Sequence, residues 1–149
     1  MLRGEILLKN KFLRMTKVVL DINIFILALF WKGVPNQLLK RTLKGEISNF
    51  TSSQILEELK EKLSDKFKLP FEKVKEFLEI IIFTSQIIYP KKKLNVVKKD
   101  PSDNKIIECA IEAKASFIIS GDKHLLELKR YSGIKIVSSK EFLSLLNKN

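Results

Sequence analysis

Four acidic residues are spread along the chain, and each lies beside the end of a predicted strand or the start of a predicted helix. They are Asp21, Glu58, Asp103 and Asp122. The loops of an open parallel sheet gather at the carboxyl ends of its strands, so we expect these side chains to converge there. Converging carboxylates raise one another's pKa, and a hard divalent cation relieves that repulsion because it prefers oxygen ligands. The sequence therefore predicts metal-dependent chemistry at one edge of a sheet.

Each of these acids also has an ordinary structural explanation. Asp21 and Asp122 follow short apolar runs and could cap the helices that come next. Asp103 could cap a helix or occupy its first turn, where a negative charge interacts favourably with the helix dipole. Glu58 lies in a segment rich in lysine and glutamate, where a glutamate is usually solvated. Two acids in the same strand–acid–helix arrangement are harder to explain by capping than one, which favours the convergent site.

Three polar residues near these acids are candidates for supporting roles. Asn23 could orient Asp21 or a phosphate oxygen, or act as a competing helix cap. Ser120 could support Asp122 or a metal-bound water. His124 is the single histidine of the chain, and we expect it on the surface or behind the ligands instead of among them.

The charge balance favours a polyanionic partner. The 149 residues include 28 Lys and Arg against 17 Asp and Glu, which gives a formal net charge of +11. Strongly basic proteins attract nucleic acid, although a lysine-rich surface can also serve solubility. An acidic pocket that needs a cation, on a basic body, suggests an enzyme that cuts nucleic acid. The chain has no Gly-rich phosphate loop, which disfavours ATP hydrolysis and NAD chemistry.

Length and composition predict one globular domain in a cytoplasmic protein. The one cysteine, Cys109, lies in an apolar helical pattern and suits a core position in a reducing compartment. A zinc site is disfavoured with one cysteine and one histidine. No apolar run reaches the roughly 18 residues that a membrane-spanning helix needs. Residues 1–14 are interpreted as an N-terminal extension or a start-codon artefact ahead of a domain over residues 15–149.

Short apolar runs alternate with helical patterns along this domain. The predicted strands cover residues 17–20, 47–51, 86–89, 117–120 and 134–137. The predicted helices cover residues 24–31 and 35–44, then begin at Ser52 or Ser53, at Pro70, at Ser102 or Asp103, near Lys123, and at Ser138 or Ser139. Such alternation argues for a parallel sheet whose right-handed crossovers cover both faces. We therefore expect a three-layer, Rossmann-like α/β/α domain with a central parallel sheet of four to five strands.

The order of these segments resembles that of the PIN-domain nucleases, and most of all the single-domain VapC-like toxins of toxin–antitoxin systems. The resemblance covers residues 17–146 and is carried by four motifs: Val18-Val19-Leu20-Asp21-Ile22-Asn23, the segment 52–59, Asp100-Pro101-Ser102-Asp103-Asn104-Lys105, and the segment 118–126. Each motif alone is weak, but four in order with matching spacing are strong. Two positions depart from the family pattern: Ile22 replaces the usual threonine, and His124 stands where relatives often carry a second aspartate.

The resemblance implies a metal-dependent endoribonuclease that hydrolyses phosphodiester bonds and leaves a 5′-phosphate and a 3′-hydroxyl. Asp21, Asp103 and Asp122 would hold Mg²⁺ or Mn²⁺, with Glu58 as a direct or water-mediated ligand. It also implies a homodimer and a cognate antitoxin protein that blocks the acidic site. A basic loop over residues 90–99 could hold the RNA backbone or simply be solvated, and its lysines are Lys91, Lys92, Lys93, Lys98 and Lys99.

Three alternatives stay open at this point. A PIN nuclease of this kind could serve RNA processing or quality control instead of a toxin–antitoxin pair. It could also be a catalytically weak domain that binds RNA or protein, an alternative that Ile22 and His124 motivate. A phosphate-accepting receiver-like domain also gathers acids at a sheet edge, but the late lysine it needs is matched only superficially, by Lys140.

Overall fold

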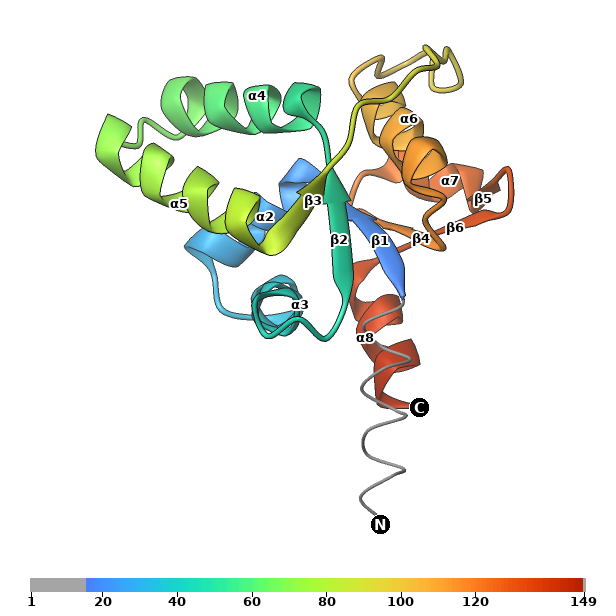
Figure 1. The fold of residues 1–149 in the computed structure, drawn as a ribbon, viewed down its shortest axis with the longest axis horizontal. Helices are drawn as coiled ribbons and strands as arrows, with labels where there is room; N and C mark the ends of the chain where they lie inside the picture. Colours follow the sequence, from blue (N-terminus) through green and yellow to red (C-terminus); the bar gives the residue numbers. More distant parts are fainter. Residues whose placement is uncertain (1–15, 149) are drawn as a thin grey trace.

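A six-stranded sheet organises the protein, with helices packed against it (Figure 1). The computed structural model describes residues 16–148. The strands are β1 (Lys17–Leu20), β2 (Ser48–Thr51), β3 (Ser85–Ile87), β4 (Phe117–Ile119), β5 (Arg130–Tyr131) and β6 (Ile134–Val137). Their order is β3-β2-β1-β4-β6-β5, and every neighbouring pair is parallel except β5 with β6. The predicted α/β fold is confirmed, with five parallel strands and one short antiparallel strand that the sequence did not predict.

Most of the helices begin close to the predicted positions. The helical segments of the described residues are α2 (Ile22–Phe30), α3 (Val34–Leu43), α4 (Ser53–Glu61), the π-helix η1 (Lys62–Lys66), α5 (Phe71–Thr84), α6 (Asp103–Ala113), α7 (Lys123–Leu128) and α8 (Ser139–Asn147). Ser52 and Ser138 cap α4 and α8, because their hydroxyls accept hydrogen bonds from the first turns of those helices. Ser102 occupies the cap position of α6, but its hydroxyl donates to Asp100 instead.

The central strand β1 is buried on both faces. Val18, Val19 and Leu20 have no exposed surface, although successive side chains of a strand point to opposite faces. Helix α6 contacts β1, β2 and β4. Helix α8 reaches β4 through an edge-to-face contact of Phe142 with Phe117, with ring centroids 5.2 Å apart, and it also contacts α3. Burial on both sides explains why this strand is an uninterrupted apolar run in the sequence.

Two local features differ from the predictions. The strands β5 and β6 form a hairpin in which Tyr131 pairs with Ile134, so the turn consists of Ser132 and Gly133 alone. Both have positive φ angles, 49° and 83°, as a tight two-residue hairpin turn requires. The second difference is that the helix predicted to begin at Ser52 or Ser53 widens after α4 into η1, where the Phe67 amide donates to the carbonyl of Lys62.

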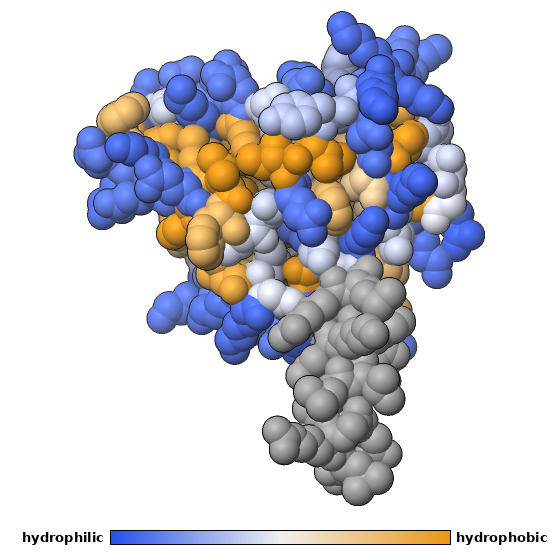
Figure 2. Space-filling model, viewed as in Figure 1, coloured by the Kyte–Doolittle hydropathy of each residue, from blue (hydrophilic) through white to orange (hydrophobic). Residues whose placement is uncertain are grey.

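The face seen in Figure 2 carries a concentration of apolar side chains. Figure 2 shows them over the face formed by α5 and β3, bordered by hydrophilic residues. On α5, the side chain of Phe83 is 90% exposed. This face lies on a different element from every acidic residue predicted to form the site.

Among residues 16–148, no single helix is long and apolar enough to cross a membrane. Only α2 and α3 taken together reach the required length and apolar composition, and that pair is bent by 103°. Cys109 is buried in α6, as predicted for a core residue. The prediction about residues 1–14 lies outside the described part of the chain.

Candidate active site

The carboxyl ends of β1 and β4 lie side by side and carry the first two acids. The two strands are parallel neighbours, with Leu20 opposite Ile119. Asp21 follows Leu20 directly, and its backbone N–H donates to the Ile119 carbonyl at 3.0 Å. Asp122 follows the end of β4 after Ser120 and Gly121. Both aspartates line the same cavity, so the structure brings this pair together at the sheet edge.

A buried serine connects these two acids. The hydroxyl of Ser120 donates to Oδ2 of Asp21 at 2.6 Å, and its oxygen accepts from the backbone N–H of Asp122 at 2.9 Å. Ser120 has no exposed surface, and Asp21 is 3% exposed. Ser120 therefore supports Asp122 only through its backbone, and the carboxylate that it orients is that of Asp21.

The loop that enters α6 adds two more carboxylates. One oxygen each from Asp100, Asp103 and Asp122 lie within 4.8 Å of one another. The Ser102 hydroxyl donates to Oδ1 of Asp100 at 2.6 Å and holds that side chain in the loop. Sequence reasoning did not include Asp100 in the site, although its position three residues before Asp103 in a turn was an available signal.

Asp103 has a carboxylate oxygen without a partner. The residue is 5% exposed, and its Oδ2 is buried with no hydrogen bond in the structure. A buried unpaired carboxylate oxygen is costly, and native structures usually satisfy such an atom with a proton, a water or an ion. Because Asp100 and Asp122 place further carboxylate oxygens beside the Asp103 side chain, this is the arrangement that a hard cation would satisfy.

We call the space enclosed by these residues the acidic cavity. Its lining residues are Asp21, Ile22, Asn23, Glu58, Lys62, Asp100, Ser102, Asp103 and Asp122. Its volume of about 30 Å³ gives room for a water molecule or a small ion. The donor set is dominated by carboxylate oxygens, which fits Mg²⁺ or Mn²⁺ and not a soft, sulfur-preferring metal.

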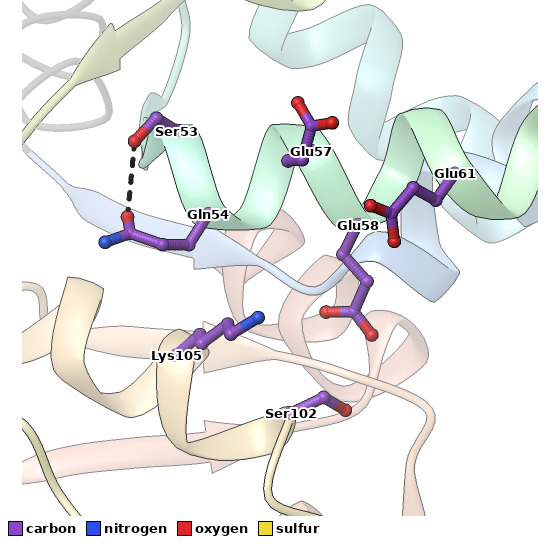
Figure 3. A pocket seen from close by; sticks show the side chains of 7 residues that line it. All are labelled: Ser53, Gln54, Glu57, Glu58, Glu61, Ser102 and Lys105. Carbon is purple, nitrogen blue, oxygen red and sulfur yellow. Dashed lines mark hydrogen bonds between the residues drawn. The ribbon is translucent and has the colours of Figure 1, made fainter.

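Glu58 approaches the acidic cavity from α4. Figure 3 shows it directed toward Ser102, across a cleft of about 560 Å³ between α4 and α6, whereas Glu57 is directed away. Glu58 and Ser102 line both this cleft and the acidic cavity, so the cleft lies next to it. Lys62, one turn further on, places Nζ 3.9 Å from Oε1 of Glu58. Sequence reasoning missed Lys62, because nothing in the local pattern marks a cation among the acids.

The acidic cavity raises the pKa of two of its carboxyl groups. Burial raises the pKa of Asp21 from 3.8 to about 6, and the charges of Asp122 and Glu58 add to this, while the Ser120 hydrogen bond opposes it. Burial also raises the pKa of Asp103 to about 8, and the neighbouring carboxyl group of Asp122 and the charges of Asp21 and Asp100 act in the same direction. Both shifts follow from placing like charges where water is excluded, and a bound divalent cation would reverse them.

Helix capping, the structural explanation for these acids, holds at some positions and not at others. Asp122 does cap α7, because its Oδ1 accepts from the backbone N–H groups of His124 and Leu125 at 2.8 and 3.3 Å. Asp21 occupies the cap position of α2, but its side chain makes no capping bond. Asp103 is the first residue of α6 and lies in its first turn. Capping and a place in the acidic cavity therefore coexist at Asp122, while capping does not account for Asp21.

The lysines of the basic loop, residues 90–99, lie outside the acidic cavity. All five are exposed: Lys91, Lys92, Lys93, Lys98 and Lys99. Lys98 and Lys99 line a separate pocket of about 290 Å³ together with His124, which is also absent from the lining of the acidic cavity. The structure thus does not join the predicted lysines to the predicted carboxylates in one pocket.

The backbone of the basic loop is nevertheless held against α6. Asn104 accepts from the N–H groups of Val96 and Val97 at 2.9 and 2.8 Å, and its amide donates to the Val97 carbonyl at 3.0 Å. Further along the helix, Glu108 accepts from Leu94 N–H at 2.8 Å. The lysines therefore project from an anchored segment that leads directly into Asp100.

Comparison with known proteins agrees with this geometry. The PIN domain family matches residues 17–124, from β1 into α7, and the chain belongs to this family of nuclease-type folds. A protein of Methanocaldococcus jannaschii, described as uncharacterized protein MJ1680, is 38% identical over 140 residues, which cover 85% of this chain and 89% of that protein. The family match contains all four predicted acids, and the relative's description assigns no activity.

Proposed function

We propose that this PIN-domain protein is a Mg²⁺- or Mn²⁺-dependent endoribonuclease that cuts RNA at the acidic cavity. The observation that carries the proposal is the buried, unpartnered Oδ2 of Asp103 beside the carboxylates of Asp100 and Asp122. Several carboxylates buried together repel one another, and a divalent cation relieves this repulsion. Membership of the PIN-domain family supports the choice of a nuclease from among metal-dependent activities.

In this proposal the position of each acid in the acidic cavity sets its role. Asp21, Asp103 and Asp122 would hold the cation, with Asp100 as an added ligand and Glu58 at the side that opens to the cleft. The bound cation would neutralise charge on the phosphate and lower the pKa of a water that attacks phosphorus. Water then adds across one P–O bond, leaving a 5′-phosphate and a 3′-hydroxyl.

Residues that do not ligate have positioning roles. Ser120 holds the Asp21 carboxylate through its 2.6 Å hydrogen bond, so that the ligand is oriented before the cation arrives. Lys62 lines the same cavity and carries a positive charge that suits a phosphate oxygen. The exposed lysines of the basic loop would attract the RNA backbone from further away.

The direct test is cleavage of labelled single-stranded RNA by the purified protein with Mn²⁺, with Mg²⁺ or with EDTA. We expect cleavage only with a cation, and loss of cleavage in Asp21→Asn and Asp122→Asn. Asparagine caps a helix about as well as aspartate, so Asp122→Asn should keep α7. Asp65→Asn is the matched control, because Asp65 is exposed in η1 and lies outside the acidic cavity. Cleavage that survives EDTA and both cavity variants would overturn the proposal.

One observation favours a second candidate, a domain that binds RNA without cutting it. Lys62 places a positive charge at the acidic cavity, 3.9 Å from Glu58, where it partly neutralises that acid without a metal. This candidate predicts RNA binding that is unchanged by EDTA and by Asp103→Asn, with no cleavage under any condition. The cleavage experiment above separates the two candidates.

We also propose that the nuclease is the toxin of a toxin–antitoxin pair, which acts as a homodimer and is blocked by a cognate antitoxin protein. The support for this part is the motif order shared with VapC-like toxins. Induced expression of the chain alone should then arrest cell growth, and Asp122→Asn should not. Growth that continues with active nuclease present would favour a role in RNA processing or quality control.

A further inference from the structure

A second groove opens beside the acidic cavity, between α2 and η1. Its lining residues are Asn23, Ile26, Leu27, Trp31, Lys62, Lys66, Phe67 and Gly121, and we call it the stacking groove. Asn23 and Lys62 also line the acidic cavity, and Gly121 immediately precedes Asp122. The two spaces are therefore adjacent, with Asn23 and Lys62 on their common border.

One wall of the stacking groove is an exposed aromatic surface. Trp31 is the C-terminal cap residue that follows α2, and 58% of its surface is exposed. The ring of Phe30 meets Trp31 edge to face at 5.7 Å between centroids and stacks on Phe67 at 5.0 Å. Phe67, the residue after η1, therefore supports the Phe30–Trp31 pair by packing against Phe30. A large indole surface held in place in this way is prepared for stacking, because little freedom remains to be lost on binding.

Two lysines border this aromatic surface. Lys62 and Lys66 are the first and last residues of η1, and both line the groove. Nζ of Lys66 lies 5.7 Å from the centre of the Phe67 ring. The π-turn, closed by the bond from the Phe67 amide to the Lys62 carbonyl, positions both lysines on the groove side of the helix. Such turns occur often at functional sites.

The geometry points to a nucleotide-binding subsite for the strand that the acidic cavity cuts, an inference that rests on the proposed function. One unpaired base of a single-stranded RNA would stack on Trp31, and the phosphates beside it would lie near Lys62 and Lys66. Aromatic stacking combined with a basic border is how proteins hold single strands without reading their sequence. A groove of about 280 Å³ is at the small end of ligand sites, which suits one nucleotide and not a duplex.

A border shared with the acidic cavity distinguishes this groove from other exposed apolar features. The pocket on α5 is larger, at about 670 Å³, but it lies apart from the acids and is lined by Glu76 and Glu79, which would repel a nucleic acid. The stacking groove instead combines an aromatic surface, two cations and a shared border with the carboxylates. Its occupant would therefore be the nucleotide next to the scissile phosphodiester.

Trp31 provides a direct readout, because it is the single tryptophan of the chain. We expect a short single-stranded RNA, added in EDTA so that no cleavage occurs, to quench tryptophan fluorescence saturably. The same sequence as a blunt duplex should quench far less, because its bases are already stacked. The intensity reports contact at Trp31 and not binding elsewhere on the basic surface.

Variants then measure the contribution of the stack. By anisotropy of labelled RNA, Trp31→Ala should weaken binding roughly 5- to 150-fold, the range that follows from losing one base–aromatic stack. Trp31→Phe should retain most of the affinity. Phe83→Ala is the matched control for an exposed aromatic residue, and Lys75→Ala on α5 is the control for Lys66→Ala. In cleavage assays Trp31→Ala should raise KM more than it lowers kcat, as expected for a binding contact.

The outcomes separate the subsite from the proposed function. Quenching by single strands together with weaker binding of Trp31→Ala, but not of Phe83→Ala, supports the subsite. RNA that is bound and cut while Trp31 fluorescence and Trp31→Ala affinity stay unchanged overturns the subsite and leaves the nuclease proposal standing. RNA that is neither bound nor cut with any cation overturns both.

Discussion

The hydroxyl of Ser120 donates a 2.6 Å hydrogen bond to Oδ2 of Asp21, across a separation of 99 residues in the sequence. The two residues follow neighbouring parallel strands, β4 and β1, at the same edge of the sheet. Both are almost fully buried, so the bond forms where water does not compete. It is the link that fixes the orientation of the first acid before any ligand binds.

Replacing Ser120 with alanine should therefore act through Asp21. The carboxylate would lose its hydroxyl donor, and the Asp122 amide would lose its acceptor. We expect the pKa of Asp21 to rise further above about 6, and the free energy of unfolding of the metal-free protein to fall by about 1–3 kcal/mol at neutral pH. Urea unfolding measures this loss. Ser116→Ala, at the exposed start of the same strand region, should change stability by less than about 0.5 kcal/mol.

Stability of the metal-free protein should depend on pH through Asp21 and Asp103. Their folded-state pKa values, about 6 and about 8, lie above the ordinary aspartate value of 3.8, so the folded chain binds protons that the unfolded chain has released. Stability with respect to these groups is therefore greatest below 3.8, where both states hold the protons. It falls as the unfolded chain releases them above 3.8, and the fall is complete near pH 6 for Asp21 and near pH 8 for Asp103. Thermal unfolding in EDTA across this window tests the sign. The contribution of Asp103 is the part of the pH dependence of stability that Asp103→Asn removes. If the pH dependence is the same in this variant, the raised pKa of Asp103 is contradicted.

The substitution Asp103→Asn should stabilise the metal-free protein and abolish its response to cations. An amide removes the buried negative charge while keeping the shape, and its N–H can donate to a neighbouring carboxylate. We expect Tm in EDTA at alkaline pH to rise by roughly 2–8 °C, which corresponds to about 1–2 kcal/mol for a domain of this size. Wild type should gain Tm with Mg²⁺ or Mn²⁺ and the variant should not. A strongly destabilised variant would mean instead that Asp103 is needed in the first turn of α6.

Loss of the Asn104 side chain should release the basic loop from α6. Three hydrogen bonds between Asn104 and the loop backbone would be lost in Asn104→Ala, two of them to buried groups. We expect a destabilisation of about 2–4 kcal/mol, from buried backbone groups left unpaired, and faster trypsin cleavage after the loop lysines. Glu108→Gln keeps an oxygen acceptor for Leu94 and should be digested at the wild-type rate. Equal digestion of all three proteins would show that other contacts hold the loop.

Local sequence patterns predicted the elements well because local physics governs them. The all-apolar run of β1 matches a strand buried on both faces, and the serines at 52 and 138 cap their helices as their side-chain chemistry predicts. The hairpin of β5 and β6 was missed because its turn, Ser132-Gly133, carries a weaker signal than Asn-Gly, and a two-residue strand has no periodicity to detect.

The same distinction between local pattern and tertiary contact applies to the acidic site. That Asp21 and Asp122 end neighbouring strands follows from a parallel α/β order, which the alternation of apolar runs and helices already determined. The sequence could not determine that Asp100 joins Asp103, or that Lys62 enters the acidic cavity, because those placements depend on a loop conformation and a π-turn. Nor could it pair Ser120 with Asp21 instead of with the Asp122 side chain.

By itself the sequence determined how most strands and helices follow one another along the chain, the strand ends near which Asp21 and Asp122 lie, and a basic surface. Tertiary structure alone decided which oxygens are buried together, which of them lacks a partner, and that Trp31 lies beside them. The physical reason is that strands and caps are set by neighbours a few residues away. Burial, pKa and the shape of a cavity are set by side chains that meet only after β1, η1 and the start of α6 have packed together.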